Sequence, residues 1–439
     1  MNFPQPQFHH FANGLTLMVT PNPGANIVAA RLFLKAGSCQ ELPEERGLAN
    51  LLAAVLTKGT QARSALTLAE SVEGMGAGFG TDAIHDYFVV SLKAVGDDFP
   101  QLLDLAADVV RNPVFPESEI ELERRMVLQI IQSRREQPFT LAFNTLCRVL
   151  YPNHAYADST SGHLDTVAHL QRFHLKAFHH RYFRPDNLII SVAGAVDLDR
   201  VRQWVEGCFG DWHVSPIAPR SPMPCPPFPA SQWCAQIHPS QQAMIMVGYR
   251  VPGVTDPAYV PLKLLSTYLG NGMSSRLFVQ LRERLGLAYD VSAFYPTRYH
   301  GSALVAYLGT APDNGAIALK HLYAELQRLS QEPLPLSLLQ SLRNKILGQY
   351  LLGKQTNEQL AHLLGWYQVL GLGSSFDQRF QDQVATVTAD DLWAVAQQYL
   401  QTPVVSVLGS ADMLETLEPM RWTIADNSRQ YRPWDPGLP

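Results

Sequence analysis

Short apolar runs along the chain alternate with longer stretches in which apolar residues recur every three or four positions. In the first half, the run 88–92 (FVVSL) precedes such a stretch at 99–111, and prolines then lead into the pattern ELERRMVLQIIQ. In the second half, the run 303–307 (ALVAY) precedes a stretch at 315–330, and prolines again lead into the pattern LLQSLRNKILGQY. The short runs predict strands and the longer periodic stretches predict helices.

The two halves follow the same order of elements, which indicates an internal repeat. Arg124 and Arg343 fall at matching points of the two long helical patterns, 219 residues apart. A second match joins the stretch from Thr166 to the strand LIISVAG with the stretch from Thr386 to VVSVLGS. Matching order at nearly one offset favours duplication over the open alternative, two unrelated α+β domains with similar periods.

A proline-rich segment separates the halves. Residues 213–230 read HVSPIAPRSPMPCPPFPA, with seven prolines and no helical or strand period. Such a segment is a semi-rigid connector, so we predict domains at 1–212 and 232–439 with a linker at 213–231. Each domain is predicted to be an α+β sandwich, a mainly antiparallel sheet with helices on one face. The tail 421–439 has little period, and its role stays open.

Charge and composition argue against several classes of function. The 439 residues carry a formal net charge of −5 without a cluster of Lys or Arg, which disfavours nucleic-acid binding. No apolar run approaches the roughly 20 residues of a membrane span, and the N-terminus does not resemble a signal peptide. The five cysteines are far apart and form no C-x-x-C pair, so we expect free thiols in the reducing cytoplasm.

The segment 45–60, ERGLANLLAAVLTKGT, predicts a helix. Leu48, Leu51, Leu52 and Val55 form an apolar stripe at helical spacing, with a glycine before it and another after it. The segment resembles the motif region of the pitrilysin and mitochondrial-processing-peptidase family, approximately G-x-A-H-x-x-E-H-x-x-x-K-G-T. The matching residues here are Gly47, Ala49, Lys58, Gly59 and Thr60.

The resemblance extends over essentially the whole chain. It includes the residues Gly37, Ser38, Glu41, Asn13, Gly14, Leu15, Pro185, Asp186 and Asn187, although Cys39 stands where the family has an arginine. Chains of this family form clam-shell halves. In the family motif, two histidines bind zinc and the glutamate acts as general base on the zinc-bound water.

Every position of that zinc site is altered in this chain. The resemblance places Asn50, Ala53 and Ala54 at the positions of the two histidines and the glutamate, and Ile130 at the distal glutamate ligand. Alanine and isoleucine have no lone pair for a metal, and a single asparagine amide is a poor zinc ligand. We therefore expect this chain to hold no metal and no cofactor, and to be unable to cut peptides alone.

Histidines elsewhere in the chain are candidates for a substitute metal site. None belongs to a recognised zinc motif with its acidic partner, and we expect surface or capping roles for them rather than metal binding. They are His163, His169, His174, His179, His180, the pair His9–His10, and His85 beside Asp86.

A second motif of the family is retained. Residues 268–295 read YLGNGMSSRLFVQLRERLGLAYDVSAFY, and the family pattern is approximately G-G-x-x-S-R-L-F followed by L-R-E-x-x-G-L-A-Y. The resemblance implies that Arg282 and Tyr289 hold the substrate backbone and stabilise the tetrahedral oxyanion. The alternative is structural: Arg282 pairs with a neighbouring carboxylate and Tyr289 packs. Arg276 is less certain, because it fits an anchor at the start of the helix.

These features predict a non-catalytic subunit of a heterodimeric zinc peptidase. A homologous partner would supply H-x-x-E-H and zinc, while this chain supplies Arg282 and Tyr289, and an extended peptide would be the substrate. A different class of function, an inactive homologue that serves as a structural or peptide-binding scaffold, stays open. A peptidase active alone through an unrecognised site is the least favoured reading.

Overall fold

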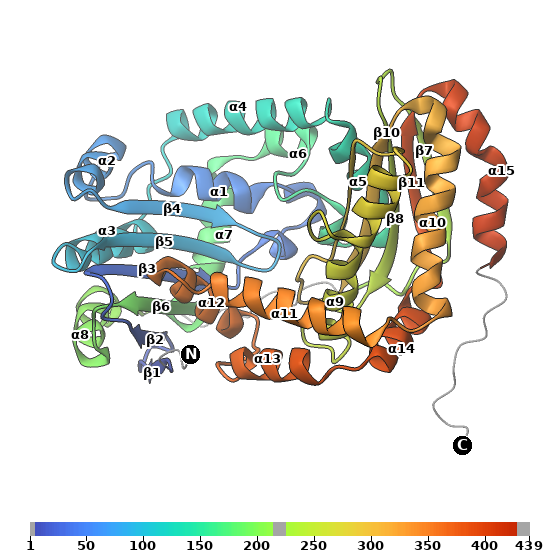
Figure 1. The fold of residues 1–439 in the computed structure, drawn as a ribbon. Coiled ribbons are helices and arrows are strands. Elements are labelled where there is room, and N and C mark those ends of the chain that lie inside the picture. The colour runs from blue at the N-terminus through green and yellow to red at the C-terminus, as the bar shows by residue number, and fades with distance from the viewer. Residues whose placement is uncertain (1–4, 214–224, 428–439) are drawn as a thin grey trace. The chain divides into compact units, whose positions relative to one another are not determined.

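The computed structural model describes residues 5–213 and 225–427. The described chain divides into two compact units. Unit 1 comprises residues 5–132, 158–213 and 349–379, and unit 2 comprises residues 133–157, 225–348 and 380–427. Each unit contains one sheet and its own set of helices (Figure 1). This confirms the prediction of two α/β domains with mainly antiparallel sheets.

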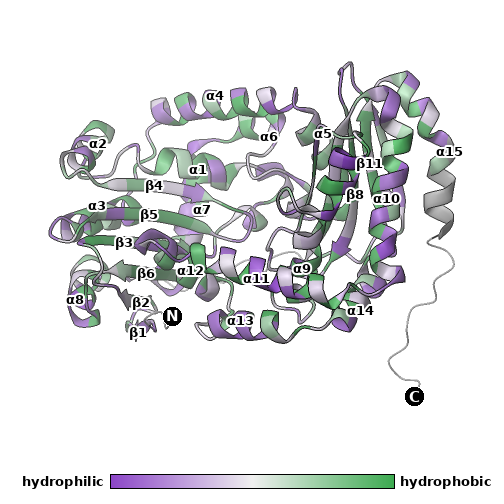
Figure 2. Ribbon diagram, viewed as in Figure 1, coloured by the Kyte–Doolittle hydropathy of each residue, from purple (hydrophilic) through white to green (hydrophobic). Residues whose placement is uncertain are grey.

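The sheet of unit 1 has six strands in the order β1-β2-β6-β3-β5-β4. All neighbouring strands are antiparallel except β2 and β6. The strands are β1 (Gln7–His10), β2 (Thr16–Pro21), β3 (Ile27–Leu34), β4 (Gly78–Ala83), β5 (Phe88–Val95) and β6 (Leu188–Gly194). The edge strand β4 is much less apolar than its neighbour β5 (Figure 2).

Helices cover both faces of this sheet, so the prediction of helices on one face only is wrong for unit 1. Alternate residues of β3 point to opposite faces: Leu32 belongs to the main core of the unit, whereas Phe33 lies against α12. Because a side chain at Gly365 of α12 would lie 2.4 Å from the ring of Phe33, a glycine lets this helix reach the sheet. The helices are α1 (Leu48–Leu56), α2 (Ala65–Gly74), α3 (Phe99–Arg111), α4 (Glu117–Arg134), α6 (Leu164–His169), α7 (Arg172–Tyr182), α8 (Leu198–Phe209) and α12 (Asn357–Val369).

The sheet of unit 2 has five strands in the order β7-β11-β8-β10-β9, and only β7 and β11 are parallel. The strands are β7 (Gln232–Ile237), β8 (Ala243–Val251), β9 (Asp290–Phe294), β10 (Ser302–Thr310) and β11 (Val404–Gly409). The helices are α5 (Pro138–Leu150), α9 (Tyr259–Gly270), α10 (Gly315–Gln331), α11 (Leu336–Leu352), α13 (Phe376–Thr386), α14 (Ala389–Tyr399) and α15 (Ala411–Asn427). The helices α5 and α10 lie on opposite faces of this sheet (Figure 1).

The units differ from the domains predicted at 1–212 and 232–439, because each unit contains a helix from the other half of the sequence. Within unit 2, Ser406 of β11 donates a 2.9 Å hydrogen bond to the carbonyl of Ala142 in α5. Within unit 1, the amide of Asn357 in α12 donates a 2.7 Å hydrogen bond to the carbonyl of Ile27. These helices bury sheet faces that would otherwise expose apolar side chains to water.

Parts of the predicted linker and tail lie outside the described residues, namely 214–224 and 428–439. Within the described ranges, no helix is both long and apolar enough to cross a membrane. No disulfide joins any two of the five cysteines, all of which lie in the described ranges.

Candidate functional site

A buried glutamate fixes the start of α1, the helix that carries the altered zinc motif. The Glu41 carboxylate accepts hydrogen bonds from the backbone N–H groups of Gly47 (3.1 Å) and Ala49 (2.7 Å). Burial raises the pKa of Glu41 to about 8, although both backbone donors and Arg46 favour the charged form. Gly47 has a φ of +98°, and a Cβ there would lie 2.7 Å from the carbonyl of Ser161. The matches to the family at Glu41 and Gly47 are thus explained by how α1 begins.

The structure places three of the altered motif positions on α1 and the fourth on α4. Ala53 is buried and its carbonyl accepts a 2.8 Å hydrogen bond from Thr81 of the edge strand β4, while Asn50 and Ala54 are half-buried. Ile130 is 46% exposed. These four side chains provide no carboxylate, imidazole or thiol. Across the described part of the chain, no group of three His, Cys, Asp or Glu residues could hold a metal ion.

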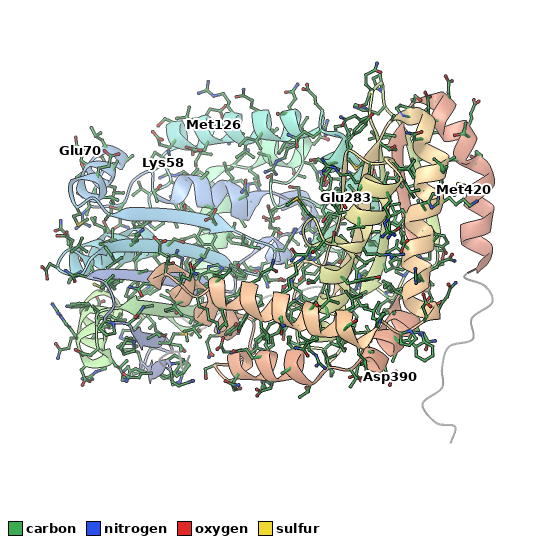
Figure 3. All side chains as sticks on the ribbon, viewed as in Figure 1. Lys58, Glu70, Met126, Glu283, Asp390 and Met420 are labelled. Atoms are coloured by element: carbon green, nitrogen blue, oxygen red, sulfur yellow. The ribbon has the colours of Figure 1, made fainter. Side chains whose placement is uncertain are left out.

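The retained K-G-T end of the motif has a structural explanation. Lys58 forms a 2.8 Å ion pair with Glu123, a buried carboxylate on α4 (Lys58 is labelled in Figure 3). Gly59 has a φ of +133° and Thr60 donates a 2.6 Å hydrogen bond to Asp108 of α3. Sequence reasoning missed Glu123. The one sequence feature that could have indicated Glu123 is its place on the apolar face of α4, among Ile120, Val127 and Ile131.

The second motif begins where α9 meets the edge strand β9. Gly270 ends α9, and a Cβ there would lie 1.8 Å from the backbone nitrogen of Ala293, so no other residue fits without moving the backbone. Arg276 forms a bidentate ion pair with Glu325 of α10, at 2.7 Å and 2.9 Å. Arg276 is therefore an anchor for this segment, the role that the sequence left open.

The segment that carries Arg282 is a π-helix, Phe278–Arg284. Its wider turn is closed by a 3.2 Å hydrogen bond from the N–H of Leu285 to the carbonyl of Gln280. The segment then ends at Gly286, which has a φ of +63°. Single π-helical turns are rare and are found frequently at functional sites.

Arg282 and Tyr289 both present their side chains to solvent. Arg282 is exposed, its guanidinium carbon lies 5.0 Å from the ring centroid of Phe278, and it forms no ion pair with any described residue. Tyr289 is 61% exposed, and its backbone N–H is bonded to Gly309 just before β9 begins. Among the described residues, Arg282 therefore has no carboxylate partner and Tyr289 is not packed, which are the two contacts that the structural alternative requires. Glu283, next to Arg282, is also exposed (Figure 3).

Seven of the eight histidines singled out from the sequence have structural partners among the described residues, and the eighth, His180, is exposed on α7. His174 accepts a 2.9 Å hydrogen bond from the N–H of Gln171 at the start of α7, and His163 contacts Asp158 at 2.9 Å. His179 contacts the carbonyl of Val110 at 2.8 Å, and burial lowers its pKa to about 4. His169 contacts a carbonyl of its own helix, His10 contacts Thr16, His9 lies edge-on to Phe11, and His85 is bonded to Ser38.

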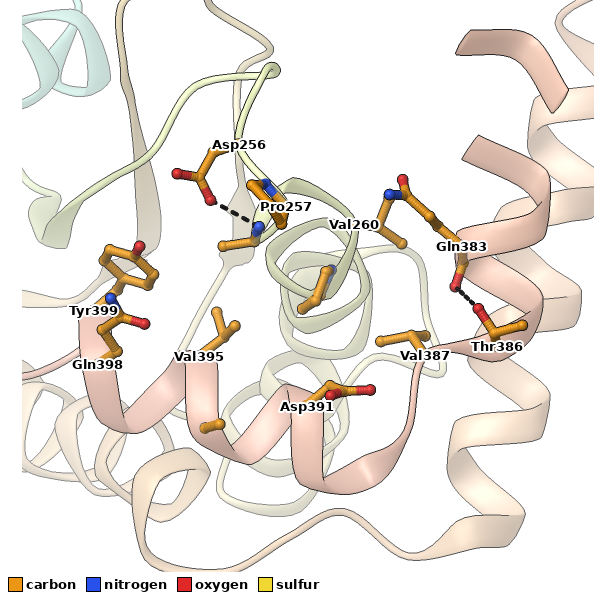
Figure 4. A pocket seen from close by; sticks show the side chains of 13 residues that line it. Asp256, Pro257, Val260, Gln383, Thr386, Val387, Asp391, Val395, Gln398 and Tyr399 are labelled. Atoms are coloured by element: carbon orange, nitrogen blue, oxygen red, sulfur yellow. Dashed lines mark hydrogen bonds between the residues drawn. The ribbon is translucent and has the colours of Figure 1, made fainter. Parts of the chain in front are cut away.

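Two cavities of unit 2 lie beside α9. One, of about 430 Å³, lies between the start of α9 and the helices α13 and α14 (Figure 4). Its two carboxylates act as helix caps, since Asp256 accepts from the N–H of Ala258 and Asp391 accepts from the N–H of Thr388. The other, of about 390 Å³, lies between the end of α9 and β9, and contains Lys263.

Comparisons with known proteins agree with this arrangement. A family model described as "Insulinase (Peptidase family M16)" matches residues 17–163, and one described as "Peptidase M16 inactive domain" matches residues 169–346. An "uncharacterized zinc protease" of Streptomyces coelicolor is 26% identical over 407 residues, which are 90% of this chain and 88% of the relative. A Bacillus subtilis protein with the same description is 26% identical over 365 residues, 82% of this chain and 88% of the relative.

Solved structures have the same fold. A protease from Helicobacter pylori superposes with a TM-score of 0.89 at 22% identity, over 93% of this chain and 100% of that one. A Pseudomonas fluorescens structure described as "peptidase M16 inactive domain" gives a TM-score of 0.87 at 23% identity, over 92% of this chain and 98% of that one.

Proposed function

Because this chain belongs to the M16, or pitrilysin, family of peptidases, we propose that it is the zinc-less subunit of a heterodimeric metallopeptidase. A homologous partner carries H-x-x-E-H and the zinc ion. This chain contributes Arg282 and Tyr289, which bind the substrate backbone and stabilise the oxyanion. The observation that carries the proposal is the contrast between an erased zinc site and an Arg/Tyr segment whose side chains are exposed.

The erased half of the site explains why a partner is needed. Hydrolysis by this family requires two imidazoles, a distal carboxylate and a general base on the zinc-bound water. Asn50, Ala53, Ala54 and Ile130 supply none of these groups. The rest of the motif region keeps its structural contacts, Glu41 at the start of α1 and Lys58 with Glu123 at its end. A chain that keeps the structural contacts of the motif region but has no metal ligands there is what we expect of a non-catalytic subunit.

The retained half of the site has the chemistry of an oxyanion clamp. A guanidinium offers a fixed fork of donors and a phenol adds one short hydrogen bond, both suited to the charge that develops on a tetrahedral intermediate. Arg282 is exposed without a carboxylate partner among the described residues, and it stands on a π-helical turn, a rare backbone form that is frequent at functional sites. These features support a role for Arg282 and Tyr289 in binding a ligand.

The substrate in this proposal is an extended peptide. Each sheet ends in an edge strand, β4 in unit 1 and β9 in unit 2. A peptide that adds to a sheet edge gains affinity through its backbone hydrogen bonds and little sequence preference, so we propose broad specificity. Five cysteines without a disulfide suit a cytoplasmic complex, because disulfides form in oxidising compartments.

The experiment that tests the proposal is capture of this chain from its native cells. Mass spectrometry identifies the proteins that accompany it, and metal analysis of the same sample measures zinc. We expect a homologous chain with H-x-x-E-H near one-to-one and about one zinc per pair. Recovery of the chain alone, or with unrelated proteins and no zinc, would refute the heterodimer and leave the scaffold role.

A further inference from the structure

The smaller cavity of unit 2 is built from one face of α9 and the strand β9. Lys263, Ser266, Thr267 and Gly270 line it, at the i, i+3, i+4 and i+7 spacing of a single helix face. Residues 292–296, on and after β9, form the opposite wall, and residues 271–272 close one end. Its volume is about 390 Å³, and it is open to solvent, so it can hold part of a larger ligand.

Lys263 brings an ammonium group into this cavity without a counter-charge. Its Nζ donates a weak 3.4 Å hydrogen bond to the carbonyl of Tyr295, and no described carboxylate lies within ion-pair distance of it. Burial alone lowers the pKa of Lys263, with no charged neighbour contributing. One of its three donors is in use, and the Nζ lies 6.0 Å from the ring centroid of Tyr295, so two donors remain for a ligand.

A second ammonium group lies against the residues that close one end of this cavity. Lys345 of α11 donates a hydrogen bond to the carbonyl of Asn271, and a Cβ on Gly272 would lie 3.5 Å from its Nζ. Lys345 also forms no ion pair within the described ranges. Lys263 therefore lines the cavity and Lys345 lies beside its end, and each half-buried cation is bound to a backbone carbonyl instead of a carboxylate.

Such an arrangement favours an anionic ligand. A cation withdrawn from water is unfavourable unless a negative charge approaches it, and a bound anion would supply that charge. The cavity is larger than a simple inorganic ion needs, and its lining residues include Phe294 and Tyr295 as well as Ser266 and Ser292. Mixed walls of this kind suit a carboxylate attached to a larger molecule.

We infer that this cavity binds the carboxylate of a peptide through Lys263, with Lys345 assisting at its end. The carboxylate belongs either to the C-terminus of the peptide or to an aspartate or glutamate side chain. This site is separate from Arg282 and Tyr289, and its occupation needs neither a partner subunit nor zinc. It rests on the proposed function only in taking a peptide as the ligand.

Isothermal titration calorimetry on the isolated full-length chain tests the inference with three N-acetylated alanine- and serine-based peptides. The first has a free C-terminus and no acidic residue, the second is C-terminally amidated with one central glutamate, and the third is amidated without an acid. We expect the first or the second to bind, and Lys263→Met to weaken that binding by about 10- to 100-fold. Lys345→Met should weaken it less, and Lys320→Met, an exposed lysine of α10, should leave it unchanged.

The peptide that responds identifies the source of the carboxylate, the C-terminus or the side chain. Thermal unfolding provides a second measurement: the responding peptide should raise the Tm of the wild-type chain and not that of Lys263→Met. The inference is overturned if no carboxylate peptide binds, if the uncharged peptide binds equally well, or if Lys263→Met and Lys345→Met both leave the affinity unchanged. Because the readout is binding by the isolated chain, such a failure would leave the proposed peptidase complex standing.

Discussion

The Glu41 carboxylate and the backbone N–H of Ala49 are joined by a 2.7 Å hydrogen bond that closes the first turn of α1. The carboxylate is buried, and the charged groups that act on it are Arg46, which favours its charged form, and Glu45, which disfavours it. Desolvation outweighs the hydrogen bonds and raises the pKa of Glu41 to about 8. The ionised carboxylate caps the helix best, but burial favours the protonated form of Glu41. The stability of unit 1 should therefore depend on pH through this residue.

The stability of the chain should fall as the pH rises between about 4.5, the ordinary pKa of Glu41, and about 8, its pKa in the folded protein. In that window the folded state keeps a proton that the unfolded state has lost, so each rise in pH favours unfolding. The Glu41→Gln side chain cannot lose a proton, so the unfolding free energy of this variant should fall less with pH between about 4.5 and about 8. Chemical denaturation of both proteins at several pH values measures the difference. Equal slopes would show that Glu41 does not titrate in this way.

Loss of the cap itself should be visible in a second variant. Glu41→Ala leaves the N–H groups of Gly47 and Ala49 without an acceptor, so it should destabilise the chain by about 1–2 kcal/mol across the pH range. Glu41→Gln keeps one carbonyl oxygen and should cost less. If the alanine and glutamine variants unfold at the same denaturant concentration at low pH, the hydrogen bonds to Glu41 contribute little.

The close approach of Gly270 to β9 predicts a destabilising Gly270→Ala substitution. Its Cβ would lie 1.8 Å from the nitrogen of Ala293, so α9 and the strand would have to separate, at a cost of about 1–3 kcal/mol or more. Gly348→Ala is the matched control, because it lies in the helix α11 with no heavy atom within 4 Å of the added Cβ, and it should be neutral or stabilising. Denaturant unfolding of the two variants compares them. Equal stabilities would mean that α9 does not pack this closely.

The sequence predicted the element order and the altered motif more completely than the spatial arrangement. Periodicity identifies α5 and α12 as helices, but an apolar face does not specify which sheet it will cover. The helix α5, from the first half of the sequence, belongs to unit 2, and α12, from the second half, belongs to unit 1. The π-helical turn at Arg282 and the cavity around Lys263 were likewise beyond prediction. Both depend on backbone geometry and on neighbours distant in sequence, such as Glu325 and Tyr295.

Substitution of Arg282 or Tyr289 should reduce turnover by the proposed heterodimeric peptidase while leaving assembly intact. Loss of one oxyanion donor typically lowers kcat by about 10²- to 10³-fold, so Arg282→Ala and Tyr289→Phe should each approach that loss. Both side chains are exposed, so the stability of the isolated chain should change little. Arg284→Ala, at an exposed position of the same π-helical segment, is the control and should keep its activity. Full activity of both variants would refute the proposed clamp.

Restoring the lost residues should restore zinc binding. The combined variant Asn50→His, Ala53→Glu, Ala54→His and Ile130→Glu places two imidazoles and a base on α1 and a carboxylate on α4 of the same unit. Because Lys58 and Glu123 already tie these helices together at 2.8 Å, we expect about one zinc per chain by metal analysis. Without zinc the variant should be less stable than the wild type, since Ala53 is buried, and added zinc should raise its Tm.

The position of the fourth ligand is tested by moving it one helical turn. A variant with the same three substitutions on α1 but Met126→Glu in place of Ile130→Glu should bind zinc more weakly, since Met126 lies on the same exposed face of α4, one turn earlier (Figure 3). If Met126→Glu binds zinc equally well or better, the assignment of Ile130 to the lost ligand is wrong. If neither variant exceeds the zinc content of the wild type, α1 and α4 no longer hold the geometry of a zinc site. In that case the backbone of α1 and α4, and not only the four substituted side chains, would be unsuited to binding zinc.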